Sequence, residues 1–334
     1  MYQNYKNRWF RDTDYGKIKK DIIKNLTRRE ISERLLSRSC RKGLVMKEYI
    51  ITTDNNADLP DSYYEEHGVG CTWLSYTVDG QHYSHKDFMP VKDFYEKMRK
   101  GSMPTTAQVN PSNARALFEP YLKEGRDILH IAFSSGLSGT YNSCCIAAEE
   151  LREEYPERKI LVIDSLAASL GQGLLVYLAQ RKKEAGEDME TVAAWTEAHK
   201  KNIVHLFTVD DLDHLYRGGR VSRTTAVLGG MLNIKPVLHV DNEGKLIPIG
   251  KVRGRKKSIM ELVSLMDKKT GSYRESCDTV FISHGDCLED AEFLADKVRQ
   301  KYHIRTEIIN YVGAVIGAHS GPGTLALFFL GDER

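Results

Sequence analysis

Residues 127–143, DILHIAFSSGLSGTYNS, combine an apolar run with a turn rich in serine and glycine. The run from Ile128 to Phe133 predicts a buried strand, and the residues from Tyr141 to Tyr155 predict a helix. Backbone N–H groups, hydroxyls and the positive end of a helix dipole meet at such a turn and favour a negative group. We therefore expect this turn to hold the anionic head of a ligand.

The small residues of the turn divide into two roles. Gly136 would let the backbone approach the ligand, and Ser134 and Ser135 could donate hydrogen bonds to it. Ser138 and Thr140 fit the commonest role of such residues at this position, which is to cap the helix. We take Ser135 as the candidate ligand-binding hydroxyl and Ser138 as the candidate cap.

The composition is that of a globular protein. The chain has 334 residues, of which 41% are hydrophobic and 28% charged, enough for two domains with cores. No apolar run approaches the roughly 18 residues that cross a bilayer, and a secretory signal is not evident. The six cysteines are scattered without a CxxC pair. We expect a cytoplasmic protein with reduced thiols, no metal site and no cofactor.

Charge is distributed unevenly along the chain. Residues 1–47 hold 14 Lys and Arg against 5 Asp and Glu, so the other residues hold 34 against 41. The acidic body argues against nucleic acid as a partner. The basic extension 1–47 could form amphipathic helices that contact an anionic membrane surface peripherally. Its thin apolar stripe favours a mobile tail instead.

The first half of the body alternates strands and helices. Strands are predicted at 49–54, 69–78, 127–133 and 159–165, and helices at 91–99, 113–123, 141–155 and 189–201. This alternation predicts a doubly wound, mostly parallel sheet over residues 48–200. A polar loop at 101–112 carries two prolines, and Thr105 and Thr106 are secondary candidates for ligand binding there.

The second half is richer in strands. They are predicted at 204–209, 234–240, 246–252, 279–283, 305–309 and 324–329, with helices only near 255–267 and 287–301. The turn after His239 predicts a hairpin, so the sheet is at least partly antiparallel. We expect an α+β sandwich with a mixed sheet over residues 201–334.

Three features of this half could carry chemistry. Residues 217–223 place three arginines around a glycine pair, and residues 251–257 form a second basic cluster; either suits phosphate or an acidic partner surface. His319 lies among small residues in a segment rich in glycine, which we interpret as a loop holding a head-group ligand.

These pieces, in this order, resemble the DegV family of fatty-acid-binding proteins, the binding subunits of bacterial fatty acid kinase. The resemblance spans about residues 49–330. Its landmarks are Asp54, Pro104 to Gln108, Ser134 to Tyr141, Asp164-Ser165, Gly218 to Ser222, Lys235 to Leu238, Lys251 to Gly254, and His319 to Gly323.

The resemblance implies two α/β domains with a long-chain fatty acid buried between them and its carboxylate held by Thr106, Ser135 and His319. Thr105, Ser134 and Gly136 would support this head-group site. The protein would do no chemistry itself; a separate kinase subunit would phosphorylate the presented carboxylate to an acyl phosphate. That subunit would dock on Arg217, Arg220 and Arg223. Asn55-Asn56 and Ala107 depart from the hydroxyl residues usual in the family.

Two enzymatic alternatives compete with this interpretation. A hydrolase could use Ser135 or Ser138 with His319, although the turn lacks the G-x-S-x-G spacing and His319 has no acidic neighbour in sequence. A phosphotransfer enzyme around Asp54 would lack a paired acid and a phosphate-binding loop, so a turn-forming or helix-capping Asp54 is the simpler interpretation.

Overall fold

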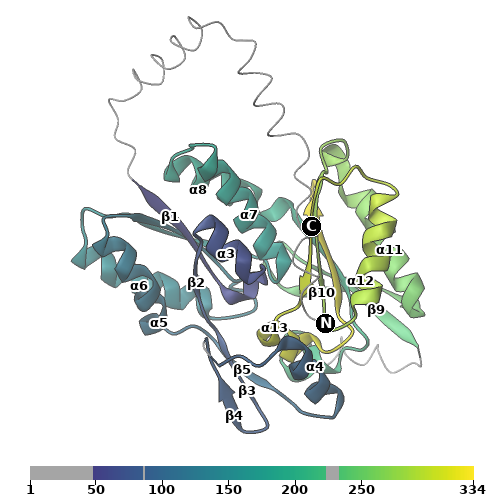
Figure 1. Ribbon diagram of the computed structural model, residues 1–334. Coiled ribbons are helices and arrows are strands. Elements are labelled where there is room, and N and C mark those ends of the chain that lie inside the picture. Colours follow the sequence, from purple (N-terminus) through teal and green to yellow (C-terminus); the bar gives the residue numbers. More distant parts are fainter. Residues whose placement is uncertain (1–47, 86, 223–232) are drawn as a thin grey trace, which may run out of the picture. The chain divides into compact units, whose positions relative to one another are not determined.

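The computed structural model describes residues 48–85, 87–222 and 233–334, and Lys47–Arg334 forms one compact unit. The predictions made for residues 1–47 therefore lie outside the described residues. Three sheets are present in the described part of the chain, two large and one small (Figure 1). No described helix is long and apolar enough to cross a membrane.

The first sheet is parallel, in the order β2-β1-β6-β7. Its strands are β1 (Tyr49–Asp54), β2 (Gly70–Thr72), β6 (Asp127–Ala132) and β7 (Ile160–Asp164). Alternate side chains of β1 and β6 face opposite sides of the sheet, so Ile50 and Ile128 join one core cluster while Ile51 and Leu129 join another. Helices cover both faces: α3 (Asp61–His67), α5 (Pro111–Lys123), α6 (Thr140–Glu154), α7 (Leu170–Glu184) and α8 (Met189–His199).

The single strand predicted at 69–78 is wrong. Two strands occupy this stretch, because β2 belongs to the parallel sheet while β3 (Ser75–Val78) begins a small antiparallel sheet with β4 (Gln81–Tyr83) and β5 (Thr105–Ala107). The side chain of Asn55 stabilises the break, since its Oδ1 accepts the Leu74 N–H at 2.8 Å. The polar loop at 101–112 thus contains a strand, and α4 (Val91–Arg99) packs its predicted face, Phe94, Tyr95 and Met98, inward.

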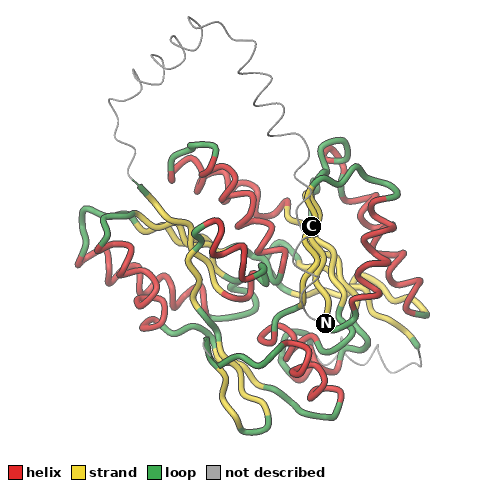
Figure 2. Tube along the Cα trace, in the orientation of Figure 1, coloured by secondary structure: helices red, strands yellow, loops and turns green. Residues whose placement is uncertain are grey.

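The second large sheet is mixed, in the order β10-β9-β8-β13-β11-β12. Only β11 and β12 pair in parallel. Its strands are β8 (Ile203–Thr208), β9 (Ile234–Val240), β10 (Leu246–Arg253), β11 (Thr279–His284), β12 (Thr306–Tyr311) and β13 (Leu325–Leu330). On one face, α11 (Arg255–Lys269) and α12 (Leu288–Arg299) close a core cluster, and Figure 2 shows these helices beside the strand layer.

The predicted fold class, a parallel sheet followed by a separate mixed sheet, is confirmed. The domain limits at residues 48–200 and 201–334 stay a prediction. Two short helices of the second half were not predicted: α9 (Asp213–Arg217) and α13 (Ala314–Ser320). His319 lies on α13, so the prediction that this segment is a loop is wrong. Glycine has a low helix propensity, so the glycines at 313, 317 and 321 kept the sequence from predicting this helix.

Helix α7 connects the two large sheets. Its residues join Ile51 and Leu129 of the first sheet and Phe207 and Phe328 of the second in one core cluster. Glycines make this close packing possible, because a Cβ on Gly171 would collide with the His205 ring and a Cβ on Gly173 with Ala57 and Leu59. The helix therefore fixes the spacing of the two sheets around the site.

Candidate functional site

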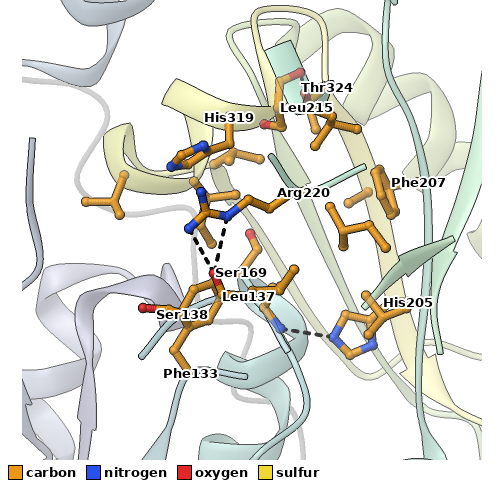
Figure 3. Close-up of a pocket in the computed structure, with 18 of the residues that line it drawn as sticks. Phe133, Leu137, Ser138, Ser169, His205, Phe207, Leu215, Arg220, His319 and Thr324 are labelled. Atoms are coloured by element: carbon orange, nitrogen blue, oxygen red, sulfur yellow. Dashed lines mark hydrogen bonds between the residues drawn. The ribbon is translucent and has the colours of Figure 1, made fainter. Parts of the chain in front are cut away.

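A cavity of about 430 Å³ lies between the second sheet and the segment that follows β6 (Figure 3). Its sheet side is formed by His205 and Phe207 of β8 and by Ala326 and Phe328 of β13. These residues sit opposite one another in the β8–β13 register, and all four are buried. The cavity is within the range of small-molecule sites, and its walls are mostly carbon.

One end of the cavity is polar. Thr106 of β5 and His319 of α13 share a hydrogen bond, with Thr106 Oγ1 and His319 Nε2 2.8 Å apart. Burial, and then the nearby Arg220, lower the pKa of His319 from 6.5 to about 4. The ring is therefore neutral at pH 7. Its Nδ1 is buried and has no hydrogen-bond partner among the described residues.

Arg220 also faces this end of the cavity. Its Nε and Nη2 donate to the Leu137 carbonyl oxygen at 3.2 and 2.9 Å, as Figure 3 shows. The side chain is half-buried, and burial lowers its pKa. Among the described residues, no carboxylate forms an ion pair with it. Its Nη1 donates to the Gly218 carbonyl oxygen. A guanidinium that has no carboxylate partner in the described part of the chain, beside a neutral histidine and hydroxyls, suits an anionic head group.

Ser135 lies outside this cavity. Its side chain is exposed, and its backbone N–H donates to Asp164 Oδ1 at 3.1 Å. Ser138, three residues later, does line the cavity beside Thr106 and His319. The structure thus brings Thr106 and His319 together and does not bring Ser135 to them. The two serines lie three residues apart in the turn before α6, and sequence alone gave no reason to prefer the second.

Ser138 is not the N-cap of α6. That position is Gly139, without a side-chain cap bond. The Ser138 hydroxyl instead lies one residue earlier, accepts the Thr140 N–H at 3.2 Å and contacts Thr140 Oγ1 at 3.0 Å. It therefore supports the start of the helix while facing the cavity.

The supporting residues predicted for the head group serve other contacts. Ser134 is buried and donates its hydroxyl to the Gly244 carbonyl at 2.8 Å, so it fastens the β9–β10 hairpin to the turn. Gly136 meets the same hairpin, because a Cβ there would lie 2.6 Å from the Glu243 carbonyl oxygen. Thr105 is exposed on β5. These three residues are not among those that line the cavity.

The three arginines predicted for partner docking differ in placement. Arg217 is exposed at the end of α9 and contacts His214 Nδ1 at 3.0 Å. Arg220 turns toward the cavity, and Arg223 lies outside the described residues. Of the two described arginines, Arg217 is the one exposed on the surface.

The geometry does not support either enzymatic alternative. No Asp or Glu belongs to the described residues lining the cavity, and His319 Nε2 is engaged by Thr106. A serine–histidine–carboxylate triad is therefore not assembled there. Asp54 is fully buried, and its carboxylate accepts N–H groups of Phe133 and Asn56 at 2.7 and 3.1 Å. It caps a 3₁₀ turn, as the simpler interpretation of the sequence predicts.

The sequence of the body matches one family model throughout. The model describes DegV family proteins and matches residues 49–332. The chain belongs to the DegV family. A DegV domain-containing protein of Clostridium perfringens is 46% identical over 291 residues, covering 86% of this chain and 99% of that one.

Solved structures of other proteins have the same fold. A fatty-acid-binding DegV protein from Thermus thermophilus matches with a TM-score of 0.76 and 30% identity, covering 85% of this chain and 99% of that one. A stearic-acid-binding protein from Eubacterium ventriosum matches with a TM-score of 0.79 and 25% identity, covering 85% and 98%. Fatty acid binding is thus described for a DegV protein and for a second protein that share this chain's architecture.

Proposed function

We propose that this DegV chain binds a long-chain fatty acid in the cavity and holds its carboxylate with Thr106, His319 and Ser138, beside Arg220. The observation that carries the proposal is a mostly apolar cavity in which Thr106 and His319 meet across 2.8 Å. Fatty acid binding by the Thermus thermophilus and Eubacterium ventriosum relatives supports the same ligand class.

The energetics divide between tail and head. Burying a sixteen-carbon chain contributes roughly 12 kcal/mol before ordering costs, at about 0.8 kcal/mol per methylene. The tail therefore supplies most of the affinity. A buried carboxylate without donors is unfavourable, so the hydroxyls, the neutral imidazole and the guanidinium fix where the head lies.

The protein presents this carboxylate, in the cytoplasm, to a separate kinase subunit that forms the acyl phosphate, and it performs no catalysis itself. The exposed Arg217 is the described residue through which that subunit docks. A coupled assay with a fatty acid kinase catalytic subunit tests this step. Arg217→Glu should lower acyl phosphate formation while fatty acid binding is unchanged; Lys123→Glu on α5 is the matched charge-reversal control. Equal rates in both variants would remove Arg217 from the docking surface.

Titration of the delipidated protein with hexadecanoate tests the binding function itself. We expect saturable binding of about one fatty acid per chain, and weaker binding of octanoate because it buries fewer methylenes. An absence of saturable binding would refute the proposal. Ester hydrolysis lost in Ser138→Ala would support the hydrolase alternative instead.

A further inference from the structure

The cavity has a second group of polar side chains besides the pair Thr106 and His319. Ser169, Ser283 and Ser320 are among the residues that line it. Their side chains are almost wholly buried, with exposed fractions of 5%, 0% and 6%. Buried serines need hydrogen-bond partners, because an unpaired buried hydroxyl is unfavourable.

Two of these hydroxyls form a chain that ends on a carboxylate. Ser169 Oγ donates to Asp58 Oδ2 at 2.6 Å, and Ser283 Oγ lies 2.9 Å from Ser169 Oγ. When Asp58 is ionised, above its raised pKa, the single proton of the Ser169 hydroxyl goes to Asp58, and Ser283 then donates to Ser169. The lone pairs of Ser283 are then left to accept a hydrogen bond from the cavity side.

Ser320 complements Ser283. Its Oγ is buried and has no hydrogen-bond partner among the described residues. The segment that follows it packs on the end of β11, because Thr324 Oγ1 donates to the Ser320 carbonyl at 3.0 Å and the Gly285 N–H donates to the Thr324 carbonyl at 2.7 Å. Ser320 and Ser283 therefore belong to the same corner of the cavity, one with a free donor and the other with a free acceptor.

This corner lies close to the head-group end. Ser320 directly follows His319 on α13, and both residues line the cavity although their side chains point about 100° apart around the helix. A ligand carboxylate at His319 thus brings the first few carbons of its chain past Ser320.

We propose that this corner binds a hydroxyl group carried on the second or third carbon of the fatty acid. A hydroxyl both donates and accepts, so it can donate to Ser283 and accept from Ser320 at once. A plain methylene satisfies neither serine. The inference rests on the proposed fatty acid site and adds a preference for 2- or 3-hydroxy fatty acids to it.

The test compares four ligands on the delipidated full-length protein: hexadecanoic acid and its 2-hydroxy, 3-hydroxy and 16-hydroxy derivatives. We expect the 2- or 3-hydroxy acid to bind about 3- to 10-fold more tightly than hexadecanoic acid, the effect of one or two net hydrogen bonds. The 16-hydroxy acid should bind more weakly than hexadecanoic acid, because its hydroxyl enters the apolar end.

Ser320→Ala and Ser283→Ala should each abolish this preference, measured as the ratio of hydroxy acid affinity to hexadecanoic acid affinity in the same variant. Ser135→Ala, an exposed serine outside the cavity, is the matched control and should retain the preference. The inference is overturned if neither hydroxy acid binds more tightly than hexadecanoic acid, or if the preference survives both variants. If the wild-type protein does not bind hexadecanoic acid at all, the proposed function is refuted instead, so the two failures are distinguishable.

Discussion

At one end of the cavity, Thr106 and His319 share a hydrogen bond across 213 residues of sequence, whereas Phe207 on the other side of Figure 3 lies in a wall with Ala326 and Phe328. The polar end is assembled from β5, α13 and the turn before α6. The apolar end is one continuous sheet surface. Directional contacts fix where a ligand head lies, while non-directional burial sets how tightly the tail is held.

Filling the sheet wall of the cavity should have the largest effect. Ala326→Phe places a ring between Ser283 and Phe207, which flank Ala326 in the sheet register. Losing about four methylenes of buried chain should weaken hexadecanoate binding roughly 100-fold. Isothermal titration measures this, and an equal loss for hexadecan-1-ol is expected because the tail is common to both. Unchanged affinity with a folded variant would place the tail elsewhere.

Removing a head-group contact should have a smaller and ligand-selective effect. We expect Thr106→Val to weaken hexadecanoate binding about tenfold, since hydrogen bonds to charged groups contribute about 1.5–3 kcal/mol. Hexadecan-1-ol has no carboxylate, so its affinity should barely change. Equal losses for both ligands would contradict the division between the two ends.

The two serines of the turn give a matched pair. Ser138→Ala should weaken hexadecanoate binding about fivefold, while Ser135→Ala should change it less than twofold, because only Ser138 lines the cavity. Parallel titrations of the two variants decide between them. A larger loss in Ser135→Ala would restore Ser135 as the carboxylate ligand that the family resemblance implies.

Asp58 should affect ligand affinity least and pH dependence most. Burial raises its pKa from 3.8 to about 7, while bonds from Ser169 and Gly313 act in the opposite direction. The folded protein therefore favours the neutral acid, and its stability falls as pH rises from about 4 to about 7. Asp58→Asn should remove this fall, so the variant gains stability relative to wild type at pH 8 and not at pH 4.

Urea unfolding of both proteins at the two pH values measures the difference. A stability difference that is the same at pH 4 and pH 8 would mean that Asp58 does not titrate in this range.

Much of the fold follows from the sequence. Apolar runs such as Asp127–Ala132 and Thr279–His284 are buried strands, and such runs can be recognised without knowledge of tertiary contacts. The helix that holds His319 was not predicted, because its sequence carries no comparable local signal. Helix α13 is seven residues long with glycine at its centre, and Gly317 is required by the Tyr95 hydroxyl packed against it. Only the tertiary contact explains that helix.

Thr106 and His319 lie together, although no local pattern in the sequence places them together. Their role as carboxylate ligands, which the family resemblance implies, stays a prediction. Ser138 and Arg220 were assigned to capping and docking, since sequence shows which residues can donate hydrogen bonds but not which way they face. The inward turn of Arg220 depends on the Leu137 carbonyl, which lies 83 residues away in the chain.

Mass spectrometry of a solvent extract from the purified protein tests the central claim most directly, because a ligand held by its tail should survive purification. We expect about one long-chain fatty acid per chain in the wild type and a marked loss in Ala326→Phe. A wild-type protein that carries no fatty acid, and takes none up from added hexadecanoate, would contradict the account.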